Sequence, residues 1–104
     1  MEKRLGLYEV LYLLEPNLTE NELENKKDFY QEFLLDRGSE VMVQNRGKRN
    51  LSYNIKGYET ANYIQMLYVG NGALLKNLNV EMQRDTKILR VMTTKLKNSL
   101  ETYA

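Results

Sequence analysis

The sequence predicts an α+β domain of ferredoxin-like architecture: a four-stranded antiparallel sheet with two helices on one face, in the order βαββαβ. Four segments have the alternating or two-sided apolar pattern of strands, and two segments have apolar residues at helical spacing. The helical segments follow the first and third strands. Right-handed connections that place both helices on one face then put the first and third strands in the centre of the sheet.

Composition supports the central position of these two strands. Residues 5–14 and 61–69 are apolar on both faces, which is typical of strands that are covered on both sides. Glu9 is the exception in the first of them. We expect its carboxylate either to be exposed on a sheet face or to pair with a basic neighbour.

Each helix is predicted from its apolar spacing and from the residues at its ends. The first is expected over residues 19–37, where Thr19 as N-cap and Glu22 three residues later form a capping box. Gly38 is a stop signal for this helix. The second helix is expected over residues 72–84, after an Asn-Gly break.

Two further strands complete the sheet. One is expected over residues 41–55, with a bend at Gly47, and a glycine turn leads from it into the third strand. The last strand is expected over residues 88–96. We therefore expect a single domain over residues 1–96 and a flexible C-terminal tail over residues 97–104, which has no apolar periodicity.

The two faces of the sheet are expected to differ. One set of alternating side chains should pack against the helices: Tyr8, Val10, Tyr12, Ile64, Met66 and Tyr68. The opposite face, which no helix remains to cover, carries Glu9, Leu11, Leu13, Tyr63, Gln65 and Leu67. An uncovered apolar face usually marks a partner site, so we expect a partner protein here. The alternative is a half-exposed face without a partner, since scattered exposed leucines are normal.

Composition argues against catalysis. The chain contains neither cysteine nor histidine, so it lacks disulfides, thiolate metal sites and an imidazole base. We expect no catalytic residue, cofactor, metal or small-molecule substrate. Small acyl-phosphate hydrolases share the fold class and remain a distant alternative. Without an apolar run of ~20 residues or a signal-peptide pattern, we expect no membrane association and a soluble, intracellular protein.

Positive charge is concentrated in the second part of the chain. The net charge is only +1, but residues 1–40 carry five basic and ten acidic side chains, a net −5, whereas residues 41–104 carry ten and four, a net +6. Salt screens charges beyond about 8 Å at physiological ionic strength, so a local patch matters more than the total. The distribution predicts a basic face on a nearly neutral protein.

The basic residues cluster at the bend of the second strand. Arg46, Lys48 and Arg49 flank Gly47, and no acidic residue occurs over residues 41–58. An uncompensated basic cluster on a β-element suits a polyanion such as rRNA. The alternative is a cluster that only solvates the tip of a hairpin.

The same stretch carries a family resemblance. Residues 47–56 read G-K-R-N-L-S-Y-N-I-K, and the pattern G-x-R-x-L-S-Y-x-I-K resembles the signature of the bacterial-type small-subunit ribosomal protein S6 family. Residues 7–10 and 15–18 resemble the family's first strand and turn, and residues 84–85 and 89–92 resemble its last strand. The matches follow the family's order and span nearly the whole chain.

The resemblance implies a structural protein of the small ribosomal subunit. Family members bind the central-domain (platform) rRNA together with ribosomal protein S18. The basic residues that the resemblance and the charge pattern assign to rRNA are Arg46, Lys48, Arg49, Lys56, Arg90, Lys95 and Lys97. They would contact phosphates, which position a protein but carry no sequence information.

The resemblance also limits what can be transferred. The four residues at the start and the short end of the chain depart from familiar members, so family contacts in those regions are not carried over. A bacterial cytoplasmic ribosome or a plastid stroma ribosome is expected. The alternative function is a ferredoxin-like module that binds a protein or a small ligand through the open sheet face, without RNA.

Overall fold

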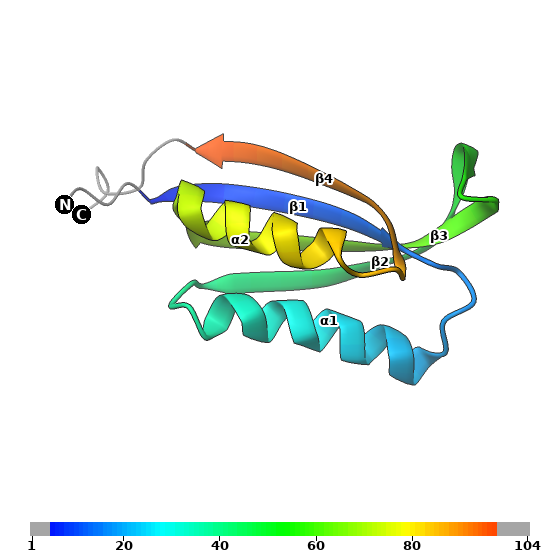
Figure 1. The fold of residues 1–104 in the computed structure, drawn as a ribbon, viewed down its shortest axis with the longest axis horizontal. Coiled ribbons are helices and arrows are strands. Elements are labelled where there is room, and N and C mark those ends of the chain that lie inside the picture. The colour runs from blue at the N-terminus through cyan, green and yellow to red at the C-terminus, as the bar shows by residue number, and fades with distance from the viewer. Residues whose placement is uncertain (1–4, 98–104) are drawn as a thin grey trace.

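The computed structural model describes residues 5–97, and its element order is the predicted βαββαβ (Figure 1). The elements are β1 (Gly6–Leu14), α1 (Glu20–Leu35), β2 (Val41–Ile55), β3 (Tyr58–Gly70), α2 (Gly72–Gln83) and β4 (Ile88–Lys97). β3 begins three residues before its predicted start, because strand pairing continues to the hairpin turn. β4 includes Lys97, and the rest of the predicted tail, residues 98–104, lies outside the described residues.

The sheet has the order β2-β3-β1-β4, and every neighbouring pair is antiparallel. β1 and β3 are therefore central, as predicted. α1 and α2 lie on the same face of the sheet (Figure 1). No helix in the described range is both long and apolar enough to cross a membrane.

The main core lies between the sheet and the helices, and it contains all six side chains that were predicted to face the helices. These residues are Tyr8, Val10, Tyr12, Ile64, Met66 and Tyr68. Tyr30 and Leu34 of α1 and Leu78 and Met82 of α2 pack against them. Alternation along the strands thus places every second side chain in the core and leaves the remainder for the opposite face.

The α2–β4 turn is attached to α1 by one carboxylate. Asp85 Oδ2 accepts hydrogen bonds from Lys26 Nζ at 2.8 Å and from the Tyr30 hydroxyl at 2.7 Å. Its Oδ1 accepts the backbone N–H of Lys87 at 2.9 Å. Burial by itself would raise the pKa of Asp85, but the hydrogen bonds from Lys26 and Tyr30 outweigh it and lower that pKa below its ordinary value.

The β2–β3 hairpin is long and irregular. Its two-residue turn uses Lys56 and Gly57, which both have positive φ, at 51° and 86°. Between the pairs Asn50–Thr60 and Ile55–Tyr58, β2 has four residues where β3 has one. Because one strand is longer than its partner here, the hairpin curls away from the plane of the sheet, as its end shows in Figure 1.

Candidate nucleic-acid and partner interface

The sheet face opposite the helices, here called the open face, is only partly open. Glu9, Leu11, Tyr63, Gln65 and Leu67 all lie on it and are partly buried. Leu13 shares this face but is only 2% exposed.

The burial of Leu13 contradicts the expectation that the whole face is uncovered. It forms a second core cluster with Ala61 and Leu89, and Leu51 and Ile55 of the curled hairpin pack against that cluster. The hairpin thus covers one end of the open face, called here the hairpin end. Leu13 is a core residue in the described structure, and it is not available on the surface to a partner.

Glu9 has neither of its two expected environments, because it is neither fully exposed nor paired with a basic residue. It lies partly buried on the open face and accepts a hydrogen bond from the Gln65 amide, its neighbour on β3. An uncharged donor therefore satisfies one carboxylate oxygen on a face that is otherwise largely apolar.

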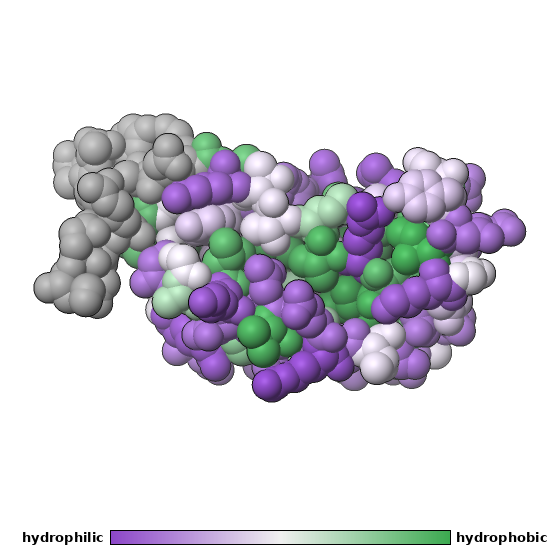
Figure 2. Space-filling view, turned by 45° about the horizontal axis from the view of Figure 1, so that its top comes forward, coloured by the Kyte–Doolittle hydropathy of each residue, from purple (hydrophilic) through white to green (hydrophobic). Residues whose placement is uncertain are grey.

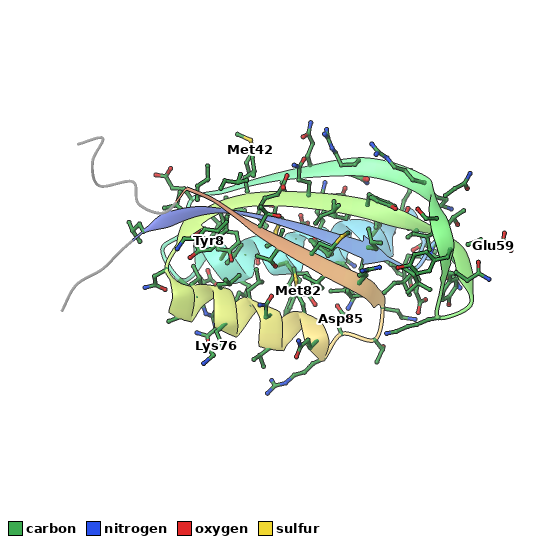
Figure 3. All side chains as sticks on the ribbon, turned by 90° about the horizontal axis from the view of Figure 1, so that it is seen from above. Tyr8, Met42, Glu59, Lys76, Met82 and Asp85 are labelled. Atoms are coloured by element: carbon green, nitrogen blue, oxygen red, sulfur yellow. The ribbon has the colours of Figure 1, made fainter. Side chains whose placement is uncertain are left out.

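At the opposite end of the open face, an apolar groove lies along the sheet edge. It has a volume of about 340 Å³, and its apolar lining includes Leu7, Met42, Leu67 and Val69. Met42 stands opposite Leu67 in the β2–β3 register and is 68% exposed. Figure 3 shows Met42 pointing outward from β2. Figure 2 shows apolar residues, in green, at the surface in areas that are separated by hydrophilic residues, in purple.

The predicted basic cluster lies at a β-bulge in edge strand β2. Gly47 has a φ of +94°, and its N–H donates to the Asn45 side chain at 2.8 Å. The register passes from Asn45 opposite Ile64 to Gly47 opposite Tyr63, so Arg46 is the extra residue. Arg46 donates to Gln44 at 3.2 Å. We call Arg46, Lys48 and Arg49 the basic bulge.

Strand alternation divides the basic bulge between two sides of the sheet. Arg49 stands opposite Ala61 and lies 5.5 Å above the Tyr63 ring, on the open face. Lys48, one residue earlier, stands opposite Asn62 and belongs to the other side. None of the described carboxylates forms an ion pair with these three cations.

The remaining predicted cations fall at two ends of the sheet. Lys56 and Arg90 line one groove of about 410 Å³ at the hairpin end, together with Asp85. Lys95 lies near the other end of β4, 5.8 Å from the centre of the Tyr8 ring and on the side of the helices. Lys97 is in β4, but its side chain lies outside the described part of the structure. The structure therefore brings Lys56 and Arg90 together and leaves Lys95 apart.

The described titratable groups with shifted pKa values lie in the core and at one turn. The described residues contain no cluster of carboxylates suited to a metal ion. Asp85 is the one described carboxyl with a clearly shifted pKa, and its hydrogen bonds hold a turn. Burial raises the pKa values of Tyr12, Tyr30 and Tyr68, which keeps these core phenols neutral.

Comparison with known proteins identifies the family. The family model described as Ribosomal protein S6 matches residues 7–95. The chain belongs to this family. It is 44% identical over 92 residues to the small ribosomal subunit protein bS6c of Guillardia theta, which covers 88% of this chain and 96% of the relative. It is 38% identical over 88 residues to bS6 of Cyanothece sp., and the match covers 84% of this chain and 83% of that relative.

A solved structure of the family has the same fold. The crystal structure of 30S ribosomal protein S6 from Thermotoga maritima matches with a TM-score of 0.81, covering 90% of this chain and 88% of that chain at 24% identity. The two chains therefore share one fold. The relatives of this chain include bacterial bS6 and plastid-type bS6c proteins, which supports a cytoplasmic or a plastid ribosome.

Four surface residues were absent from the predicted site. Leu7, Met42 and Val69 line the apolar groove, and strand alternation could have placed all three on the open face. Tyr53 lies between Leu51 and Ile55 in the strand expected over residues 41–55, and it is 65% exposed. Its exposure follows from the curl of the hairpin, for which the local sequence has no signal.

Proposed function

We propose that the chain binds the central-domain (platform) rRNA of the small subunit together with ribosomal protein S18, as a structural constituent and not as an enzyme. In this proposal the basic bulge, Lys56 and Arg90 contact RNA phosphates. The open face contacts S18. Lys95 and Lys97 would contribute from the far end of β4.

The basic bulge is the observation that carries the RNA part of the proposal. Its cations stand on a rigid edge strand, and no described carboxylate neutralises them. Cations without a carboxylate partner can replace the counterions of RNA on binding. The release of these counterions is the main source of sequence-independent affinity. Since phosphate contacts fix position only, specificity would depend on RNA shape and on the partner protein.

The apolar groove supports the partner part of the proposal. Met42 and Leu67 are neighbours on adjacent strands, and Met42 is largely exposed. Exposed apolar surface of this kind favours a protein contact over solvent. The predicted partner residues that remain accessible are Glu9, Leu11, Tyr63, Gln65 and Leu67.

The RNA contact is tested by replacing Arg46, Lys48 and Arg49 together with alanine. Binding of cognate central-domain rRNA is titrated over salt, with saturating S18, for the wild type and the triple variant. Each phosphate contact should contribute somewhat under one unit to the log–log salt slope, by analogy with about 0.9 for B-DNA. We therefore expect a slope flatter by about two to three units and a similar loss of affinity on different RNA sequences.

A matched control removes three other cations. Replacing Lys27 of α1, Lys76 of α2 and Arg84 at the C-cap of α2 changes the net charge equally but leaves the basic bulge intact. Equal slopes for the wild type and the bulge variant would contradict the RNA contact. If both proteins then still bound S18, a protein-binding module without RNA would be the better description of this surface.

A further inference from the structure

A small hollow lies at the hairpin end of the open face, beside the basic bulge. Its volume is about 170 Å³, and its lining includes Leu13, Ile55, Tyr53, Tyr63, Arg90 and Met92. Pockets for small-molecule ligands usually measure about 300–1,000 Å³. This hollow is therefore suited to a single ring and is too small for a whole nucleotide cofactor or substrate.

Two tyrosine–arginine pairs border the hollow. Tyr53 comes from the curled part of β2, and its hydroxyl accepts a hydrogen bond from Arg90 Nη1 of β4 at 3.1 Å. Arg49 lies 5.5 Å above the ring of Tyr63, which is on β3. Three strands thus converge on one site, and the hydrogen bond from Arg90 orients the ring of Tyr53 although that residue is 65% exposed.

The chemistry of the lining favours a planar ring next to negative charge. Ile55 and Met92 supply an apolar floor beside the buried Leu13, and none of the residues lining the hollow is acidic. Arg90 lines the hollow and Arg49 lies near the ring of Tyr63, which also lines it, and neither guanidinium group has a described carboxylate partner. An apolar peptide side chain would fit the apolar floor of the hollow equally well. The two unneutralised guanidinium groups near the hollow, however, favour a ligand that carries phosphates.

We infer that the hollow binds one unpaired nucleobase of the RNA, stacked on Tyr53, with Arg90 and Arg49 directed to the flanking phosphates. This inference rests on the proposed RNA contact and adds a base-binding site to it. Stacking of unpaired bases on aromatic side chains is the common way in which proteins hold single-stranded RNA. It depends on the π-face of a base and so tolerates different bases.

The test compares Tyr53→Ala, Tyr53→Phe and Asn54→Ala in binding of cognate central-domain rRNA with saturating S18. Loss of one stacked base should weaken binding roughly 10-fold or more for Tyr53→Ala. Its salt slope should stay unchanged, because no cation is removed. Tyr53→Phe keeps the ring but loses the hydroxyl that accepts from Arg90, so it should bind much more tightly than Tyr53→Ala and slightly less tightly than the wild type. Asn54→Ala, an exposed neighbour outside the hollow, is the matched control.

Two results would overturn the inference. Tyr53→Ala could bind the RNA as tightly as the wild type, or it could weaken binding of S18 measured without RNA, which would make the hollow a protein contact. Failure of the proposed function would be recognised differently from failure of this inference. In that case the wild-type protein itself would show no salt-dependent RNA binding. Circular dichroism and urea unfolding should be unchanged in Tyr53→Ala, because the side chain is mostly exposed.

Discussion

Asp85 joins parts of the chain that are far apart in sequence. It follows α2, and it accepts hydrogen bonds from Lys26 and Tyr30, which lie 59 and 55 residues away on α1. Hydrogen bonds to a charged group contribute more to stability than those between neutral groups. The lowered pKa of Asp85 means that the folded state favours the ionised carboxylate, and stability should therefore depend on pH.

We expect Asp85→Asn to lower the free energy of unfolding by about 1–2 kcal/mol at pH 7. A carboxyl whose pKa is depressed in the folded state stabilises above its unfolded pKa of about 3.9 and loses that contribution as pH falls through the folded value. The difference between wild type and variant should therefore begin to shrink near pH 5, about one unit above the unfolded pKa, and should go on shrinking as the pH falls towards the lower, folded value. Urea unfolding over this range measures it.

Asp28→Asn is the control for this prediction, because Asp28 is an exposed carboxylate on α1. It should change stability by less than about 0.5 kcal/mol at either pH. A difference for Asp85→Asn that stayed constant with pH would show that the residue acts through its shape and not through its charge.

At the scale of single elements, α1 shows how local signals define a helix. Its N-cap Thr19 accepts the Glu22 N–H at 3.1 Å, and Glu22 accepts the Thr19 N–H at 2.8 Å. Leu18 and Leu23, at the positions of a hydrophobic staple, both pack against the main core. The helix ends before Gly38, which has a φ of +86°. The two hydrogen bonds of the capping box join residues only three positions apart.

We expect Thr19→Ala to destabilise the protein by about 1 kcal/mol, because the first turn of α1 loses a side-chain acceptor. Thr19→Ser retains the hydroxyl and should restore most of this stability. Chemical denaturation of the three proteins side by side is the measurement. An unchanged midpoint for the alanine variant would argue that the capping box contributes nothing to α1.

On the scale of the whole molecule, the curled hairpin creates a second core on the open face. Leu51 and Ile55 reach back over Leu13 and Leu89, while Met42, on the same strand, stays exposed. Glu59 marks the hairpin end in Figure 3, far from the position of Met42. One sheet face is therefore divided into a closed end and an open end, which have different functions in our proposal.

This division predicts unequal costs for two similar truncations. Leu13→Ala should lower the free energy of unfolding by about 2–5 kcal/mol, because it leaves a cavity beneath the hairpin. Met42→Ala removes an exposed side chain and should cost less than about 0.5 kcal/mol. Urea unfolding of both variants at neutral pH tests this. Small, similar losses would indicate that the hairpin does not cover Leu13 in solution.

Short-range patterns in the sequence account for much of the fold of this protein. The order of elements, the two central strands, the capping box at Thr19 and the bend at Gly47 all follow from residues within a few positions of one another. Strand alternation also separated the core set of side chains from the opposite face. The family signature over residues 47–56 depends on the same kind of local pattern.

The covering of the open face depends on contacts between residues that are far apart in sequence. The sequence suggested a uniformly uncovered surface, but the curled hairpin buries Leu13 and exposes Tyr53. The contact between Tyr53 and Arg90 joins residues 37 positions apart. Alternation defines which side of a strand a residue occupies, but the path of a hairpin depends on the apolar surface that it can bury elsewhere in the molecule. That surface exists only once the sheet has formed.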